Sequence, residues 1–166
     1  MTFNFLCISS VLNPSPLLKA AVELSCKSEY GILALLELAI HYQSGEPLQI
    51  RQIAAQQNIP DRYLEQLLAT LRRGGLVKSQ RGSKGGYLLA REPWKISLFE
   101  ILSCLEGLDV RPCEEDVNPK TVDSAVVEDI WQEARLAANA VLQKYTLAEL
   151  CEKRDSRRQL DIMYYI

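Results

Sequence analysis

Side chains suited to reading a DNA duplex are concentrated between residues 61 and 84. The outward positions of an amphipathic segment at residues 61–73 carry Arg62, Glu65 and Gln66. Arginine donates to guanine or phosphate, glutamate accepts from the cytosine N4 amine, and glutamine pairs with adenine. A glycine-rich stretch follows, whose amides and cations suit the DNA backbone or the minor groove, and it contains Arg81, Gly82, Ser83 and Lys84. The pattern predicts an interface for double-stranded DNA.

The charge is divided unevenly along the chain. The 166 residues together carry a formal net charge of −2. Residues 48–91 contain eight lysines and arginines against two acids, a net of +6, so the remainder carries −8. Such a division indicates one surface that faces phosphate and another that faces away from it. The alternative is a solvated helix face that happens to be basic, and charge alone does not separate the two.

Two short helices and a hairpin are predicted around the basic segment. Apolar residues at helical spacing predict a helix within residues 48–59, and Pro60 suits the start of a second helix over residues 61–73. Gly74 and Gly75 end that helix. Short strands at residues 76–79 and 87–90 enclose the glycine-rich stretch. A helix-turn-helix followed by a hairpin is a winged helix, so the predicted fold is mainly α with a small β-hairpin.

Further helices are predicted on both sides of this unit. Residues 28–42 are apolar on more than one face, which indicates a helix buried on two sides. Capping boxes that begin at Ser97 and Thr146 predict two short helices. Between them, residues 123–144 form a long helix with an apolar stripe that includes Ile130 and Trp131. A domain this small cannot cover so long a stripe, so a partner is implied.

The domain organisation follows from these elements. We expect residues 1–21 to be a disordered extension or a start codon placed too early, with Val22 as the true start. Residues 22–106 form the winged-helix domain, 107–121 a loop, 122–152 the long helix with the last short helix, and 153–166 a tail.

Several function classes are excluded by what the sequence lacks. No apolar run approaches the ~20 residues of a membrane helix, so we expect no membrane partner and a cytoplasmic protein. Catalysis is not expected, because no nucleophile elbow or paired-carboxylate motif occurs and His41 is the only histidine. The cysteines are widely spaced and odd in number, which argues against disulfides and zinc. They are Cys7, Cys26, Cys104, Cys113 and Cys151.

These motifs together resemble the IscR/NsrR-like family of bacterial winged-helix regulators. The resemblance runs from about residue 22 to about residue 150 and is most specific in the first half. Its motifs are Leu24–Ser25–x–Lys27–Ser28–Glu29–Tyr30–Gly31, Ile53–Ala54, Tyr63–Leu64–Glu65–Gln66–Leu67, Leu71–x–x–x–Gly75–Leu76–Val77 and Arg81–Gly82–x–x–Gly85–Gly86–Tyr87–x–Leu89.

The resemblance implies a homodimer that joins through its long C-terminal helices and presents two winged helices to a palindromic operator. It places residues 61–73 in the major groove, with Arg62, Glu65 and Gln66 on base edges and Tyr63 partly on phosphate. Two alternatives to these roles remain open. In one, Tyr63 packs against the first helix; in the other, Glu65 pairs with a nearby arginine.

Several relatives hold an iron–sulfur cluster in the loop before the long helix, but this loop keeps only Cys113. The positions of two further cysteines hold Pro119 and Ala125, which cannot coordinate iron. We therefore assign no cofactor. The alternative is a labile cluster on Cys113 and Glu29, with Glu128 or Cys104 in support. In the remaining reading Cys104 is a core residue and Cys113 a thiol that either is inert or senses redox state itself.

A protein-contact winged helix without DNA readout is the strongest competing function. Such a module has no need of outward polar residues beside a basic wing, so the +6 segment argues against it.

Overall fold

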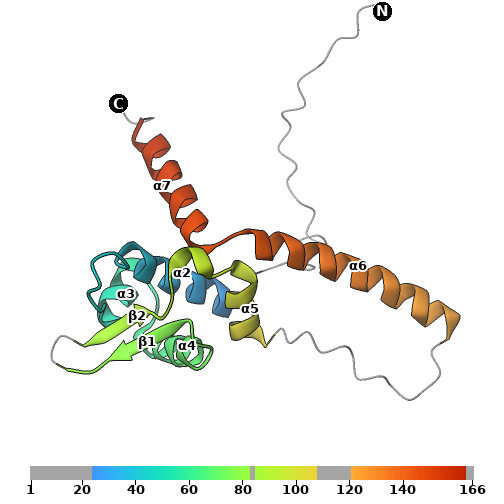
Figure 1. The fold of residues 1–166 in the computed structure, drawn as a ribbon, viewed down its shortest axis with the longest axis horizontal. Coiled ribbons are helices and arrows are strands. Elements are labelled where there is room, and N and C mark those ends of the chain that lie inside the picture. The colour runs from blue at the N-terminus through green and yellow to red at the C-terminus, as the bar shows by residue number, and fades with distance from the viewer. Residues whose placement is uncertain (1–23, 83–84, 108–120, 164–166) are drawn as a thin grey trace, which may run out of the picture.

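A computed structural model describes residues 24–82, 85–107 and 121–163. Four helices (α2 to α5) and a two-stranded hairpin form its globular part, and two further helices extend from it (Figure 1). The core is a single cluster of buried aliphatic residues, to which every element of the globular part contributes. The predicted fold class, mainly α with one small hairpin, is confirmed.

Helix α2 (Cys26–Ile40) is the centre of the core. Ala34 and Leu35 are fully buried, and Ile32 and Leu38 nearly so. Ser25 caps the helix, because its side chain accepts a hydrogen bond from the Ser28 amide. The helix packs against α3, α4 and α5, as the apolar residues on more than one of its faces indicate.

The helix-turn-helix consists of α3 (Ile50–Gln57) and α4 (Asp61–Arg73). Asn58 ends α3 in the left-handed conformation, with φ 53°, and Ile59 returns to the core. Pro60 then serves as the N-cap of α4. Helix α4 buries four leucines on one face and leaves its polar side chains on the other, so the amphipathic pattern predicted its orientation. The buried residues are Leu64, Leu67, Leu68 and Leu71.

The hairpin pairs β1 (Val77–Gln80) with β2 (Gly86–Leu89) in antiparallel register, with Val77 opposite Leu89. A backbone bridge attaches it to the start of the helix-turn-helix. The Leu48 amide donates to the Tyr87 carbonyl at 3.0 Å, and the Tyr87 amide donates back at 2.8 Å. Gly86 permits this approach, because a Cβ there would overlap the Leu48 carbonyl. The wing is thereby held beside α3.

A one-turn 3-10 helix, η1 (Pro93–Lys95), leads to α5 (Leu98–Glu106). Ser97 caps α5 by accepting from the Glu100 amide, as the capping box predicts. The C-terminal end of α5 is joined to the start of α2. Glu106 accepts hydrogen bonds from the hydroxyls of Ser25 and Ser28, and Lys27 donates to the Leu105 carbonyl.

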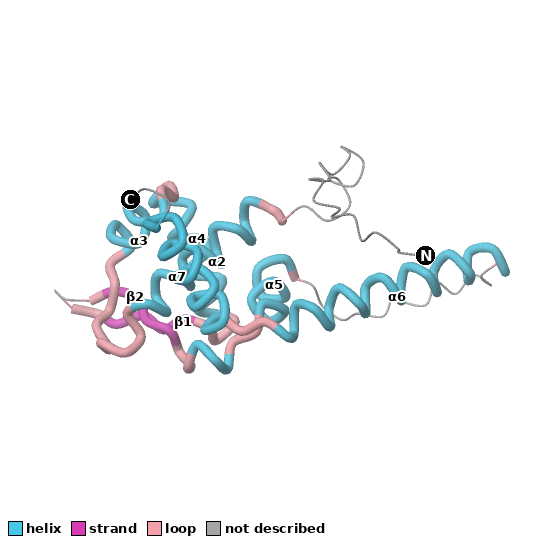
Figure 2. The backbone as a smooth tube through the Cα atoms, turned by 90° about the horizontal axis from the view of Figure 1, so that it is seen from above, coloured by secondary structure: helices cyan, strands magenta, loops and turns pink. Residues whose placement is uncertain are grey.

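Helix α6 (Val122–Lys144) leaves the globular part as a projecting arm, which Figures 1 and 2 show from two directions. None of its residues, all of which the structure describes, is buried. Several of its large apolar side chains are exposed, with Val127 at 68%, Ile130 at 64% and Trp131 at 69%.

The chain returns to the globular part through Tyr145 and Thr146. The Leu98 amide donates to the Tyr145 carbonyl and the Leu147 amide to the Ile96 carbonyl, each at 2.8 Å. Helix α7 (Leu147–Met163) then packs its first turns against α2 and η1. This helix is longer than expected, because it continues to Met163 instead of ending near residue 152. It contains no glycine or proline, so nothing in its sequence stops it.

Candidate nucleic-acid interface

The exposed face of α4 carries the three side chains assigned to base edges. Arg62, Glu65 and Gln66 are all exposed, whereas the leucines of the helix are buried. Their spacing of three and four residues places them on one side of the helix. Asp61 lies in the first turn, where the positive end of the helix dipole stabilises its negative charge. Helix α4 therefore presents a donor, an acceptor and a carboxamide at its N-terminal half.

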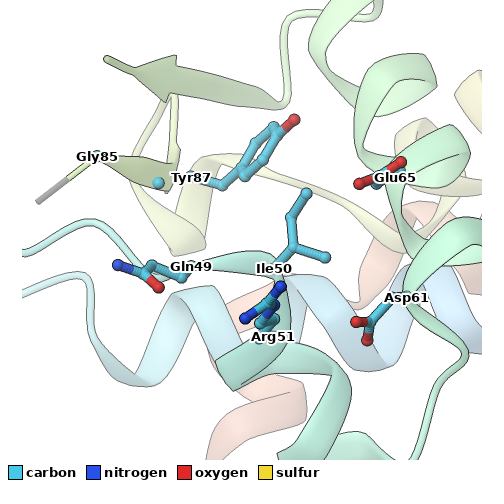
Figure 3. A pocket seen from close by; sticks show the side chains of 8 residues that line it. Gln49, Ile50, Arg51, Asp61, Glu65, Gly85 and Tyr87 are labelled. Atoms are coloured by element: carbon cyan, nitrogen blue, oxygen red, sulfur yellow. The ribbon is translucent and has the colours of Figure 1, made fainter. Parts of the chain in front are cut away.

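A groove of about 410 Å³ lies between this helix, the start of α3 and the wing. Figure 3 shows side chains from all three elements meeting there: Gln49 to Arg51 from α3, Asp61 and Glu65 from α4, and Tyr87 from β2. The Leu48–Tyr87 bridge fixes the two sides of the groove against each other. Its walls thus combine the N-terminus of α3, the cation of Arg51 and the carboxylates of Asp61 and Glu65.

Gln49 and Arg51 are groove-lining residues that the sequence alone did not single out as candidates for the interface. Both are exposed and line the groove, and the Gln49 amide donates to the Gln52 Oε1 atom at 2.8 Å. The first amides of a helix point outward and attract phosphate. The charge of Arg51 is part of the +6 segment, but its position beside the wing depends on the bridge between Leu48 and Tyr87. No local sequence pattern reveals that bridge.

The wing carries the next assigned residues. Arg81 and Gly82 are exposed at the end of β1, and Gly82 has φ 123°, a conformation that side chains other than glycine rarely adopt. Ser83 and Lys84 lie outside the described residues, so their assignment stays a prediction. The position of Arg81 beyond the paired strands suits contact with the DNA backbone.

Tyr63 does not share the exposed face of α4. Its ring is half-buried and meets the Tyr30 ring edge-to-face, with centroids 5.8 Å apart. The reading in which Tyr63 packs against the first helix is therefore confirmed. Glu65 forms no ion pair with any arginine among the described residues, so its carboxylate is available to a base.

The basic segment is not uniformly available to DNA. Arg91 pairs with Glu100 on α5, and Arg73 donates to the Thr70 hydroxyl at 3.2 Å. Arg72 donates to the Ser79 hydroxyl at 3.3 Å, which joins α4 to β1. Among the described residues Arg51, at the groove, and Arg81, after β1, form no ion pair.

The described residues do not supply a cluster site. They contain no group of three or more histidine, cysteine or acidic side chains placed to hold a metal. The Cys104 Sγ atom lies 3.6 Å from the Thr70 carbonyl, and burial raises the pKa of this thiol. Cys104 is thus a core residue and an unsuitable ligand. Glu29 is exposed in the first turn of α2, while Cys113 and Pro119 lie outside the described residues.

No helix in the described part of the chain is long and apolar enough to cross a membrane.

Fold and surface together define a helix-turn-helix transcriptional regulator with a winged hairpin. Residues 24–153 match the Rrf2 family, described as an iron-dependent transcriptional regulator. A putative HTH-type regulator of Synechocystis is 41% identical over 78% of this chain and 87% of its own length. The regulator CymR of Bacillus subtilis is 37% identical over 87% of this chain and its whole length. The structure of T. potens IscR superposes with a TM-score of 0.67 at 34% identity, covering 81% of this chain and 90% of that one.

The chain belongs to the Rrf2 family. Its members are transcriptional regulators and not enzymes, which agrees with the absence of catalytic motifs in the sequence. The resemblance to IscR-like regulators is confirmed by the T. potens structure.

Proposed function

We propose that the protein is a homodimeric, sequence-specific regulator that binds a palindromic operator in the cytoplasm. The observation that carries this proposal is the groove between α3, α4 and the wing, with the exposed residues of α4 beside it. Arg62, Glu65 and Gln66 contact base edges in the major groove. Arg51, Arg81 and the first amides of α3 contact phosphates.

The exposed stripe of α6 supports the dimer. Large apolar side chains that project together from an otherwise uncovered helix mark a protein interface. The helix of 23 residues is about 35 Å long, enough for an extended helix–helix contact with a second copy. Twofold symmetry of the protein then matches the symmetry of a palindromic operator.

The base-reading role of α4 is tested with Gln66→Ala and Arg81→Ala. Operator duplexes are first selected from a random pool with the wild-type protein. We expect Gln66→Ala to relax the preference at one base position, at a cost of about 1–3 kcal/mol for the selected site. Arg81→Ala weakens binding to all sequences and lowers the salt slope by about one. Equal losses on selected and random DNA for Gln66→Ala would contradict base readout.

We further propose that any iron–sulfur response is weak in this regulator, since Cys113 is the one cysteine retained in the loop. Anaerobic purification with an absorption spectrum and assays of iron and sulfide tests this. A colourless, iron-free protein that binds its operator supports regulation without a cluster. Stoichiometric iron and sulfide, lost in Cys113→Ser and in Glu29→Ala, would establish the labile cluster instead.

A further inference from the structure

A second groove of about 380 Å³ lies between α2 and α3, next to the DNA-facing one. Its volume falls within the ~300–1,000 Å³ typical of small-molecule sites. One wall is polar and comes from the C-terminal half of α2. The lining residues are Glu37 and His41 from α2, Leu48 before α3, and Arg51, Gln52, Ala55 and Gln56 from the start and outer side of α3.

The α2 wall contains a buried carboxylate with few partners. Glu37 is only 8% exposed, and the Gln57 Nε2 atom donates to its Oε2 atom at 2.8 Å. The Oε1 atom lies 3.9 Å from the His41 Nδ1 atom, which is itself 3.1 Å from the Glu37 backbone carbonyl. No lysine or arginine of the described chain pairs with Glu37. A buried carboxylate is stabilised by cationic or hydrogen-bonding partners, so this one suits an ammonium group.

The α3 wall offers the opposite charge. Arg51 is exposed and forms no ion pair with any described residue. A guanidinium binds a carboxylate with two parallel hydrogen bonds, which adds geometric specificity. Leu48 and Ala55 provide an apolar wall of limited size.

We propose that this groove binds a small zwitterion, an α-amino acid with a short side chain. Its ammonium group is held by Glu37, its carboxylate by Arg51, and its side chain lies against Leu48 and Ala55.

Arg51 connects this site to the interface, because it also lines the groove that faces the wing (Figure 3). A ligand carboxylate that holds the guanidinium removes one cation from the phosphate contacts. Binding of the zwitterion and of DNA therefore oppose each other, and by linkage each lowers the affinity for the other by the same factor. This regulatory step rests on the proposed DNA-binding function, whereas the binding site itself does not.

The site is tested by titrating the ¹⁵N-labelled full chain with L-alanine and recording amide chemical shifts. L-Alanine methyl ester keeps the ammonium alone, and N-acetyl-L-alanine keeps the carboxylate alone. We expect L-alanine to shift amides of α2 and α3 around the groove, with at least tenfold weaker binding of both derivatives. An absence of shifts at millimolar L-alanine overturns the site, and equal binding of either derivative overturns the assignment of a zwitterion.

Glu37→Gln supplies the decisive variant, because its amide oxygen still accepts from Gln57 while the charge is removed. We expect a loss of L-alanine binding of at least tenfold. Glu46→Gln, in the turn after α2 and outside the groove, serves as the matched control and keeps wild-type binding. A variant Glu37→Gln that binds L-alanine as the wild type does contradicts the proposal.

The coupling is measured with an operator duplex selected from a random pool. Saturating L-alanine should weaken wild-type binding severalfold and reduce its salt slope by about one. Glu37→Gln should bind DNA as the wild type does without L-alanine and show no response to it. L-Alanine that binds without any change in DNA affinity overturns the coupling. If the wild type binds no duplex at all, the proposed function fails, while the titration still decides the ligand site.

Discussion

Tyr63 is a residue of α4 whose ring contributes to the fold. The family resemblance made it a candidate for phosphate contact, and its ring turns inward and meets Tyr30 on α2. An edge-to-face aromatic pair contributes about 0.5–1.5 kcal/mol beyond the area that it buries. The contact fixes the angle between α4 and α2, and thereby the direction of the base-reading side chains.

Removing only the hydroxyl group of Tyr63 should therefore change little. We expect Tyr63→Phe to keep both the DNA affinity and the melting temperature, because the ring contact with Tyr30 remains. Tyr63→Ala should lower the free energy of unfolding by about 1–3 kcal/mol, less than the 3–5 kcal/mol of a fully buried ring. Calorimetry and fluorescence anisotropy with an operator duplex measure the two effects. A loss of DNA affinity in Tyr63→Phe at unchanged stability would instead assign the hydroxyl group to phosphate.

The periodicity of the sequence predicted the outward residues of α4 but could not predict the whole interface. The 3.6-residue repeat of leucines requires Arg62, Glu65 and Gln66 to face outward. The roles of Gln49 and Arg51 depend on the bridge that holds β2 beside α3, a contact between segments almost forty residues apart. Local patterns carry no information on such contacts, so the groove became visible only in three dimensions.

At the scale of elements, two contacts hold α5 against its neighbours, one against the end of α4 and one against the start of α2. The first is the approach of α5 to the end of α4, where a Cβ at Gly74 would overlap the Cys104 Sγ atom. Gly74 has φ −76°, so alanine is not strained there and only the missing space forbids it. Gly75, by contrast, has φ +72° and open space beside it.

This difference predicts a specific rescue. Gly74→Ala should destabilise the protein by about 1–3 kcal/mol through overpacking. In a Cys104→Ala background the same change should cost less than about 0.5 kcal/mol, because the sulfur atom is gone. Gly75→Ala should cost about 1 kcal/mol in both backgrounds, since its cost comes from the backbone conformation. Denaturant unfolding of the five variants (each glycine change alone, Cys104→Ala alone and the two double variants) and the wild type measures this coupling, and equal costs of Gly74→Ala in both backgrounds would contradict it.

The second contact joins the end of α5 to the start of α2 through Glu106. Hydrogen bonds from the hydroxyls of Ser25 and Ser28 hold the pKa of this carboxyl below its ordinary value of 4.5. The unfolded state therefore binds a proton at a higher pH than the folded state does. The contribution of Glu106 to stability is present above the unfolded pKa and is lost as the pH falls through the folded one.

Glu106→Gln should remove this part of the acid sensitivity. We expect the free energy of unfolding of the wild type to fall more steeply than that of the variant as the pH drops below about 4.5. At neutral pH the variant should be the less stable protein. Glu46→Gln, whose carboxylate forms no hydrogen bond among the described residues, should follow the wild-type profile. Parallel profiles for the wild type and Glu106→Gln would show that this contact adds no pH dependence.

Most elements could be predicted from local chemistry. The expected bounds of α4 agree with the observed ones, because proline precedes the helix and two glycines follow it. The capping box of α7 is formed as expected, with the Thr146 amide donating to the Glu149 carboxylate at 2.7 Å and the Glu149 amide donating back to the Thr146 hydroxyl at 3.3 Å. The length of α7 was underestimated, because helix starts have specific signals whereas its end has neither glycine nor proline.

At the scale of the molecule, α6 is the element on which the proposed binding of a palindromic site depends. Helix α6 projects from the globular part (Figure 2), and its apolar stripe, which includes Val127, Ile130 and Trp131, is exposed. In water such a stripe is unfavourable, and covering it with the same stripe of a second copy releases roughly 25 cal/mol per Å² of apolar surface. The proposed dimer would bring two copies of α4 to one operator, so that once one copy is bound, the other binds its half-site at a high effective concentration.

Ile130→Glu should therefore separate the copies without unfolding them. A glutamate at the centre of the stripe would be buried without a partner in the dimer, while α6 of the monomer keeps a good helix former. Analytical ultracentrifugation should show a wild-type dimer and a monomeric variant. The variant should bind a full operator only as tightly as a half-site, a loss of at least tenfold. Gln143→Glu adds the same charge on the opposite side of the helix and should remain dimeric. A variant Ile130→Glu that is dimeric and binds the full operator normally would show that α6 is not the dimer interface.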